Sequence, residues 1–172
     1  MGMDRQTSAE NRTRIRLRQR IVVSRMAILV ITAVTLLNLL LLLVKVNYHF
    51  HLSAAIPYYM NWLGLKLSDY SDVTGFRVFA AFLTIGVFVF YVACWLFSSQ
   101  KPVWLSAALV MYAIDTVMLI VLSFTVIKRP GACIFEILAH LLCLWILWNG
   151  VASGKRLRKM ARRRKVAEEQ PV

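Results

Sequence analysis

The stretch that decides the fold is ACIFEILAHLLCLWILWNGV, residues 132–151. Its twenty residues are enough for a helix to cross the roughly 30 Å hydrocarbon core of a bilayer. Most of it is apolar, but Cys133, Glu136, His140 and Cys143 follow one another at steps of three, four and three. Side chains at those steps share one face of an α-helix. Because ionisable side chains are costly in lipid and turn inward, the pattern predicts a helix of a membrane bundle with its polar seam facing other helices.

Three more apolar runs resemble this one in length, at residues 26–44, 78–97 and 103–127. The whole chain of 172 residues is 59% hydrophobic, which is well above an ordinary soluble domain. The predicted fold class is therefore all-α, a polytopic transmembrane four-helix antiparallel bundle. We divide the chain into a basic tail at 1–25, a transmembrane domain at 26–151 with an outer loop at 45–77, and a second basic tail at 152–172.

The net charge of +13 is unevenly placed. Of the 21 Lys and Arg residues, seven precede the first span, eight follow the last, and one lies between spans two and three. The other two connections hold only five between them. By the positive-inside rule, both termini are expected in the cytoplasm of a multi-pass plasma-membrane protein.

The long outer loop at 45–77 contains an amphipathic helical pattern of apolar residues. After Pro57, which suits the first turn of a helix, an apolar face contains Tyr59, Met60, Leu63 and Leu67. We expect residues 57–67 to form a short amphipathic helix, lying on the outer surface or capping the bundle.

Polar side chains recur within the predicted spans. The helical rise of about 1.5 Å per residue places most of them in the outer half of the membrane, converging on His140. The predicted intramembrane polar cluster consists of Asn38, Arg77, Thr84, Tyr91, Asp115, Glu136 and His140.

One interpretation of this cluster is structural. Arg77 would pair with Glu136 and Asp115 with His140, while Asn38, Thr84 and Tyr91 supply hydrogen bonds that fix which helices meet. The function that follows is a non-enzymatic integral membrane protein, an accessory or interaction subunit.

The alternative interpretation is a site that handles ions. Glu136 and His140 lie four residues apart, and Asp115 could complete a three-ligand site for a divalent metal. This predicts either a proton- or metal-coupled transport or sensing unit, or a metal-dependent membrane enzyme. The cysteines at 94, 133 and 143 all fall within spans and are read as small buried hydrophobic residues.

The two tails are expected to contact anionic lipid, which requires only positive charge and a membrane tether. Neither tail has an aromatic residue, so nucleic acid is not an expected partner. Another membrane protein, or a second copy of the chain, remains an open partner. The predicted lipid-contact residues are Arg12, Arg14, Arg16, Arg18, Arg20, Lys155, Arg156, Arg158, Lys159, Arg162, Arg163, Arg164 and Lys165.

Residues 47–59, NYHFHLSAAIPYY, follow a leucine-rich first span. With its SAxIPYY-like core, this segment resembles a loop of small uncharacterised four-span bacterial membrane proteins. The resemblance covers some thirty residues and implies a bacterial plasma-membrane location. It implies no function and no site residue.

Overall fold

A computed structural model of the protein describes residues 2–46, 50, 52–68, 74–125 and 133–169. These residues form five helices and no strand, namely α1 (Gly2–Leu43), α2 (Ala55–Ser68), α3 (Thr74–Phe97), α4 (Val103–Thr125) and α5 (Ile134–Glu169). Four of them, α1, α3, α4 and α5, are long and apolar enough to cross a membrane. To this extent the predicted all-helical, four-span fold is confirmed.

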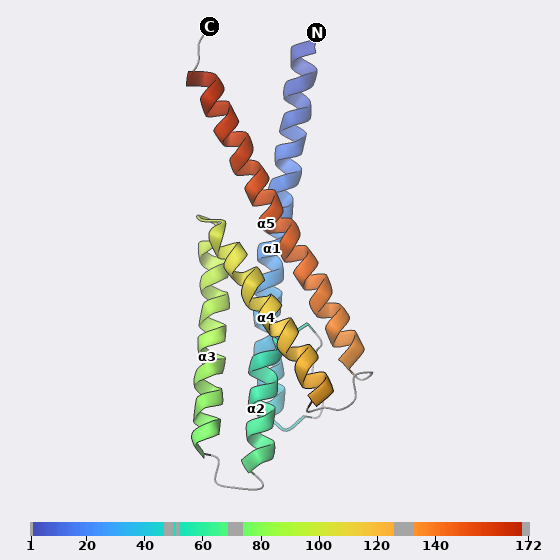
Figure 1. The fold of residues 1–172 in the computed structure, drawn as a ribbon, viewed down its shortest axis with the longest axis vertical. Coiled ribbons are helices and arrows are strands. Elements are labelled where there is room, and N and C mark those ends of the chain that lie inside the picture. Colours follow the sequence, from blue (N-terminus) through green and yellow to red (C-terminus); the bar gives the residue numbers. More distant parts are fainter. Residues whose placement is uncertain (1, 47–49, 51, 69–73, 126–132, 170–172) are drawn as a thin grey trace.

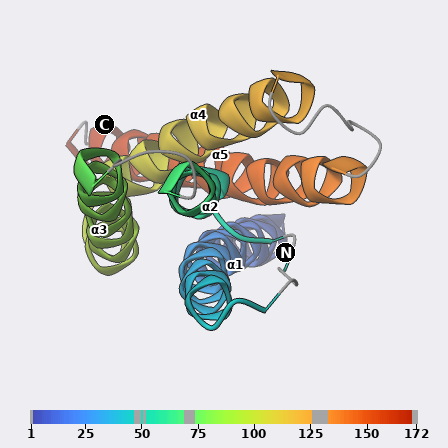
Figure 2. The same ribbon diagram turned by 90° about the horizontal axis from the view of Figure 1, so that it is seen from below.

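Both chain termini lie at one end of the molecule, which we call the terminal end (Figure 1). From there α1 runs to the opposite end, α3 returns, α4 descends again and α5 returns (Figure 1). The longest packing interface joins α1 to α5, and α5 also packs along α4. Seen along its length, the molecule has α2 in the middle, with the four long helices around it (Figure 2).

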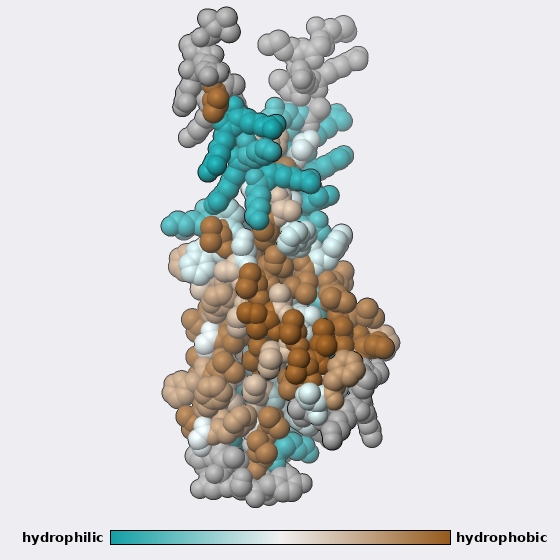
Figure 3. All heavy atoms as spheres, viewed as in Figure 1, coloured by the Kyte–Doolittle hydropathy of each residue, from teal (hydrophilic) through white to brown (hydrophobic). Residues whose placement is uncertain are grey.

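The surface of the long helices is apolar over a broad band, and the terminal end is hydrophilic (Figure 3). On α5 the side chains of Leu138, Leu141 and Trp145 are at least half exposed on this band. Glu136 and His140 are only 2% and 0% exposed. The predicted inward orientation of the polar seam is therefore confirmed.

The basic segments are helical continuations of α1 and α5, which diverge at the terminal end (Figure 1). The expected borders between tails and spans, at residues 25–26 and 151–152, therefore lie within continuous helices. Arg and Lys are good helix formers, and neither segment has a proline before residue 171 to stop the helix. The Arg14 guanidinium also forms an i,i+4 ion pair with Glu10 at 2.6 Å.

α1 and α5 cross closely where two small residues meet. The Ser24 hydroxyl donates to the Ile146 carbonyl oxygen at 2.7 Å, and a Cβ atom added to Gly150 would lie 2.5 Å from Ser24 Cβ. Gly150 and Gly154 are four residues apart, the spacing that lets membrane helices approach closely. On the other side, Arg25 Nε donates to Ser98 Oγ at 3.1 Å, which ties α1 to the carboxyl end of α3.

α1 ends in a reversal of the chain. Lys45 has a φ of 59°, and the amides of Lys45 and Val46 donate to the carbonyls of Leu42 and Leu41 at 3.1 and 3.0 Å. This is the Schellman arrangement of a helix C-terminus, with Lys45 in the position usually held by glycine. It turns the chain back toward the interior of the bundle.

α2 covers and slightly exceeds the expected helix at residues 57–67, but its orientation differs from the expectation. It stands upright beside α3 and α4, with its amino end at mid-height of the bundle (Figure 1). Ala54, Ala55 and Ile56 are buried, which their small or apolar side chains permit. The structure therefore contains a half-length helix inside the bundle, and the predicted position on the outer surface or as a cap of the bundle is not confirmed.

Candidate functional site

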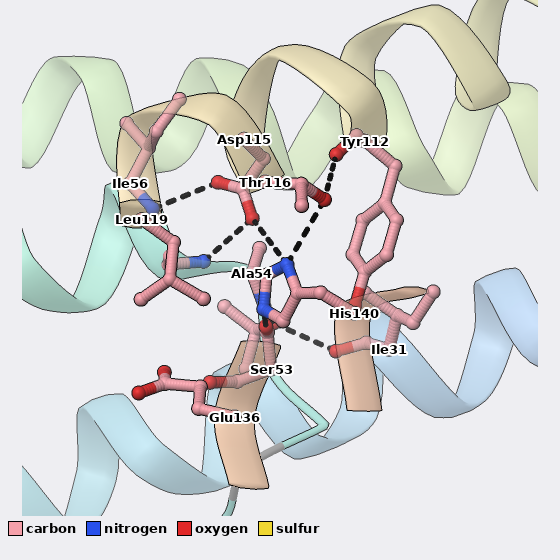
Figure 4. Close-up of polar contacts among 12 residues, drawn as sticks. Ile31, Ser53, Ala54, Ile56, Tyr112, Asp115, Thr116, Leu119, Glu136 and His140 are labelled. Atoms are coloured by element: carbon pink, nitrogen blue, oxygen red, sulfur yellow. Dashed lines mark hydrogen bonds and ion pairs between the residues drawn. The ribbon is translucent and has the colours of Figure 1, made fainter. Parts of the chain in front are cut away.

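The buried polar cluster is organised around the amino end of α2. The carboxylate of Asp115, the thirteenth residue of α4, accepts hydrogen bonds from the amides of Ala55 and Ile56 at 2.7 and 2.8 Å. One oxygen serves each amide, so the side chain of one helix caps another helix (Figure 4). A carboxylate is well suited to this position because the first amides of a helix are unpaired and carry partial positive charge.

Proline contributes to the same cap. Pro57 is the third residue of α2 and has no amide hydrogen, so the first turn has one fewer donor to satisfy. The amide of Ala54, just before the helix, donates to Thr35 Oγ1 at 2.7 Å. These contacts supply hydrogen-bond acceptors to the backbone amides at the start of α2, at a depth where water is not expected.

The chain leading into α2 is held in the same way. Asn38 donates from Nδ2 to the Phe50 carbonyl and accepts from the Phe50 amide, each at 2.8 Å. His140 Nε2 lies 2.9 Å from the Ser53 carbonyl oxygen. Non-helical backbone is tolerated at membrane depth only where the protein itself satisfies it. Asn38, Asp115 and His140, three members of the predicted cluster, therefore share one task, which is to satisfy the backbone entering α2.

The hydrogen bonds of His140 define its proton positions. Nε2 must carry a proton, because the Ser53 carbonyl can only accept. Nδ1 lies 3.2 Å from Thr116 Oγ1 and 3.8 Å from Asp115 Oδ2, and Thr116 Oγ1 is also 2.8 Å from the Tyr112 carbonyl (Figure 4). The single hydroxyl proton of Thr116 can point to Nδ1 of a neutral imidazole or to the Tyr112 carbonyl when Nδ1 is protonated. Nδ1 is thus the position at which this group can gain or lose a proton.

Tyr112 completes the immediate surroundings of the imidazole. Its ring stacks on His140 with centroids 4.8 Å apart and planes inclined by 15°. Both rings are fully buried.

Comparison with known protein families, curated proteins and solved structures finds no match to this chain.

Two predicted members of the cluster lie apart from this centre. Arg77 is exposed at the start of α3 and forms no ion pair with Glu136. Glu136 instead accepts a hydrogen bond from the Tyr59 hydroxyl at 2.8 Å, because α2 stands between α3 and the interior. The expected Arg77–Glu136 pair is wrong in this structure, whereas Asp115 and His140 do lie together.

Three members of the predicted cluster, Arg77, Thr84 and Tyr91, follow one another at steps of seven residues along α3, and their exposure changes along the helix. Arg77 is exposed, Thr84 is half-buried and accepts from Asn61 Nδ2 at 2.6 Å, and Tyr91 is buried. A step of seven residues falls about 20° short of two full helical turns, so this row of side chains drifts as it repeats. The Tyr91 hydroxyl has no hydrogen-bond partner within the part of the chain that the structure describes, contrary to its expected role.

The expected metal ligands do not form a recognisable metal site. Among the described residues, no group of three His, Cys, Asp or Glu side chains is placed to hold one ion. Both oxygens of Asp115 are already engaged by backbone amides. The three cysteines are unpaired and buried, in agreement with their interpretation as small hydrophobic residues.

The side chains of the basic extensions are largely exposed. Arg12, Arg16, Arg18 and Arg20 are exposed on α1, while Arg14 is partly covered beside Glu10. On α5 the exposed set is Lys155, Arg156, Arg158, Lys159, Arg162 and Arg163. The side chains of Arg164 and Lys165 lie outside the described residues.

Several contributors were not among the predicted site residues, namely Thr35, Ser53, Tyr59, Asn61, Tyr112 and Thr116. Only Thr35 gave a sequence signal, since it lies three residues before Asn38 and shares its face. The others act through a backbone carbonyl, a ring face, a hydroxyl or, for Asn61, a side-chain amide, and none of these has a spacing that sequence patterns reveal.

Replacing Asn38 by leucine is expected to lower the free energy of unfolding by about 2 kcal/mol, because both hydrogen bonds to Phe50 are lost at a buried position. The measurement is denaturant-induced unfolding in mixed detergent micelles. Asn149→Leu is the matched control, because the Asn149 side chain bonds to the Trp145 carbonyl of its own helix and, among the described residues, to no other helix. An equal loss of unfolding free energy in the two variants would contradict a stabilising role for the hydrogen bonds between Asn38 and Phe50.

Proposed function

We propose that this protein is a non-enzymatic, multi-pass plasma-membrane protein that acts as an accessory or interaction subunit, with both termini in the cytoplasm. The observation that carries the proposal is the use made of the buried polar side chains. Asn38, Asp115 and His140 are bonded to backbone groups of the same chain, at Phe50, Ser53, Ala55 and Ile56. Groups committed in this way are supports for the fold.

The amino end of α2 supports the same conclusion. In membrane transporters, the amino ends of discontinuous helices near the midplane bind anionic substrate groups. Here the protein's own carboxylate, Asp115, fills that position with both of its oxygens. A substrate would have to displace a bidentate internal ligand, which favours a structural role for the half-length helix.

The basic extensions supply the surface for interaction. Between Arg20 and Arg12, α1 rises about 12 Å, which exceeds the Debye length of about 8 Å at physiological ionic strength. The residues nearest the bundle, among them Arg18, Arg20, Lys155 and Arg156, are placed to attract anionic headgroups. Arg12 and Arg162, farther along the diverging helices, are available to an acidic surface of a partner protein.

Three single variants test the proposal in proteoliposomes: Asp115→Asn, Glu136→Gln and His140→Ala. We expect no proton flux above that of empty vesicles for the wild type or any variant, and no stoichiometric metal in the purified protein. An added ionophore serves as the positive control, and the variants are expected to differ from the wild type only in stability. Flux that is lost in a folded variant would establish a transport unit. Bound metal and turnover lost together would establish a metal-dependent enzyme.

A further inference from the structure

A groove runs along the lipid-facing surface where α1, α2 and α3 meet, toward the end opposite the termini. Its volume is about 600 Å³, within the range of small-molecule sites. It exists because α2 is set back between α1 and α3, as the view from below shows (Figure 2). One wall consists of leucines of α1 between positions 36 and 43, and the opposite wall includes Val78, Ala81 and Ile85 of α3.

Among the described residues that line the groove, one is charged, namely Arg77 in the first turn of α3. Its side chain is exposed, and among the described residues it has neither an ion pair nor a hydrogen bond. The Cγ of Arg77 lies against Gly64 of α2, where a Cβ atom would be 3.5 Å away. The stem of the arginine is thereby packed against α2 near the groove.

We propose that this groove binds one glycerophospholipid from the leaflet opposite the termini, with an acyl chain between α1 and α3 and its phosphate on Arg77. From Arg77 to Ile85 the helical rise gives about 12 Å, close to the roughly 15 Å of one hydrocarbon leaflet. The apolar walls match a hydrocarbon chain in both length and chemistry. The guanidinium matches a phosphate in charge and can bond it with two parallel N–H groups.

The position of the charge distinguishes this site from an ordinary lipid-facing surface. Arg77 stands at the end of the apolar groove that lies nearest the headgroup region, which is where a bound chain would place its phosphate. A lipid held there at both ends would exchange more slowly than its neighbours. The site does not depend on the proposed function, since it uses none of the three side chains that support the backbone entering α2, which are Asn38, Asp115 and His140.

The test measures lipid retained by the purified full-length protein after extensive detergent exchange, by native mass spectrometry. Three probes are added separately: dioleoyl phosphatidylglycerol, dioleoylglycerol with the same chains but no phosphate, and glycerol 3-phosphate with no chains. We expect one molecule of the phospholipid per protein, at least tenfold weaker retention of dioleoylglycerol, and no retention of glycerol phosphate. The tenfold difference corresponds to the loss of one charge-assisted hydrogen-bonded contact.

Three charge variants and two tryptophan variants locate the lipid. Arg77→Gln should reduce affinity for the phospholipid at least tenfold and Arg77→Lys by less, while Lys66→Gln, a charge loss at the exposed end of α2, leaves it unchanged. Ala81→Trp should fill the groove and abolish retention, whereas Val117→Trp, on the exposed face of α4, should not. Unchanged retention in Arg77→Gln would overturn the phosphate site. Equal retention in the two tryptophan variants, or of lipids with and without phosphate, would show annular lipid only and overturn the proposal.

Discussion

Replacing Asp115 by alanine is expected to lower the free energy of unfolding by about 3 kcal/mol. The amides of Ala55 and Ile56 would both lose their acceptor. The site is closed to solvent, since Asp115 is only 1% exposed. A hydrogen bond to a charged group contributes about 1.5–3 kcal/mol, and an unsatisfied buried donor is costly in addition. In a micelle, the polar groups of the unfolded chain find other hydrogen-bond partners. The expected loss of stability is therefore smaller than the sum of the two contributions.

The matched control is Thr125→Val, in the last turn of the same helix. Its hydroxyl is exposed and bonds to the Val121 carbonyl of α4 itself, so removal is expected to cost about 0.5 kcal/mol or less. The loss of unfolding free energy in Asp115→Asn should lie between the losses in Asp115→Ala and Thr125→Val. An asparagine side chain has one acceptor oxygen, so it can satisfy only one of the two amides. Unfolding in mixed micelles measures the stability, and hydrogen exchange at Ala55 and Ile56 reports the cap directly. Unchanged exchange at these amides in Asp115→Ala would contradict the capping role.

The second large effect is expected at the crossing of α1 and α5. Gly150→Ala should destabilise the protein by about 2–3 kcal/mol, in the range of overpacked cores. The added methyl group would overlap Ser24 and lie 3.0 Å from Leu105 Cδ2. Because Ser24 Cβ is fixed to its backbone, rotation of the serine side chain cannot relieve the contact, and the two helices must move apart.

Gly86→Ala provides the control, since a Cβ atom there meets nothing within 4 Å. That variant is expected to unfold at the wild-type denaturant concentration or slightly above it, because alanine favours helices. The double variant Ser24→Gly with Gly150→Ala should be more stable than Gly150→Ala alone, although it loses the bond to Ile146. Strict additivity of the two changes would indicate that the crossing does not depend on this contact.

The spanning helices were predictable because hydrophobic length is a direct consequence of membrane thickness. The helix α3 ends at Phe97 and α4 starts at Val103, the residues at which the second apolar run ends and the third begins. The inward orientation of the polar seam of α5 was predictable for a similar reason. Exposing Glu136 or His140 to lipid would be costly, so both side chains are expected to face the bundle interior. Both patterns depend on composition and helical periodicity alone.

The depth and partners of α2 could not be predicted in the same way. Its apolar face fits lipid, the membrane surface and a protein interior equally well, so periodicity does not distinguish among them. Asp115 was expected to pair with His140, and the two do lie 3.8 Å apart, but its closer partners are amides of Ala55 and Ile56. Every residue has such an amide, and no sequence pattern marks the ones that a distant carboxylate will bind.

The contacts that hold residues 50–56 also bear on how the protein is made. Asp115 follows Ala55 by 60 positions, and His140 follows Ser53 by 87. A ribosome therefore delivers this segment to the membrane well before its acceptor in α4 and its donor in α5 exist. Seating α2 must be a late event of biogenesis, after the final span has entered, and a nascent chain halted beyond α3 would leave the segment without these two partners.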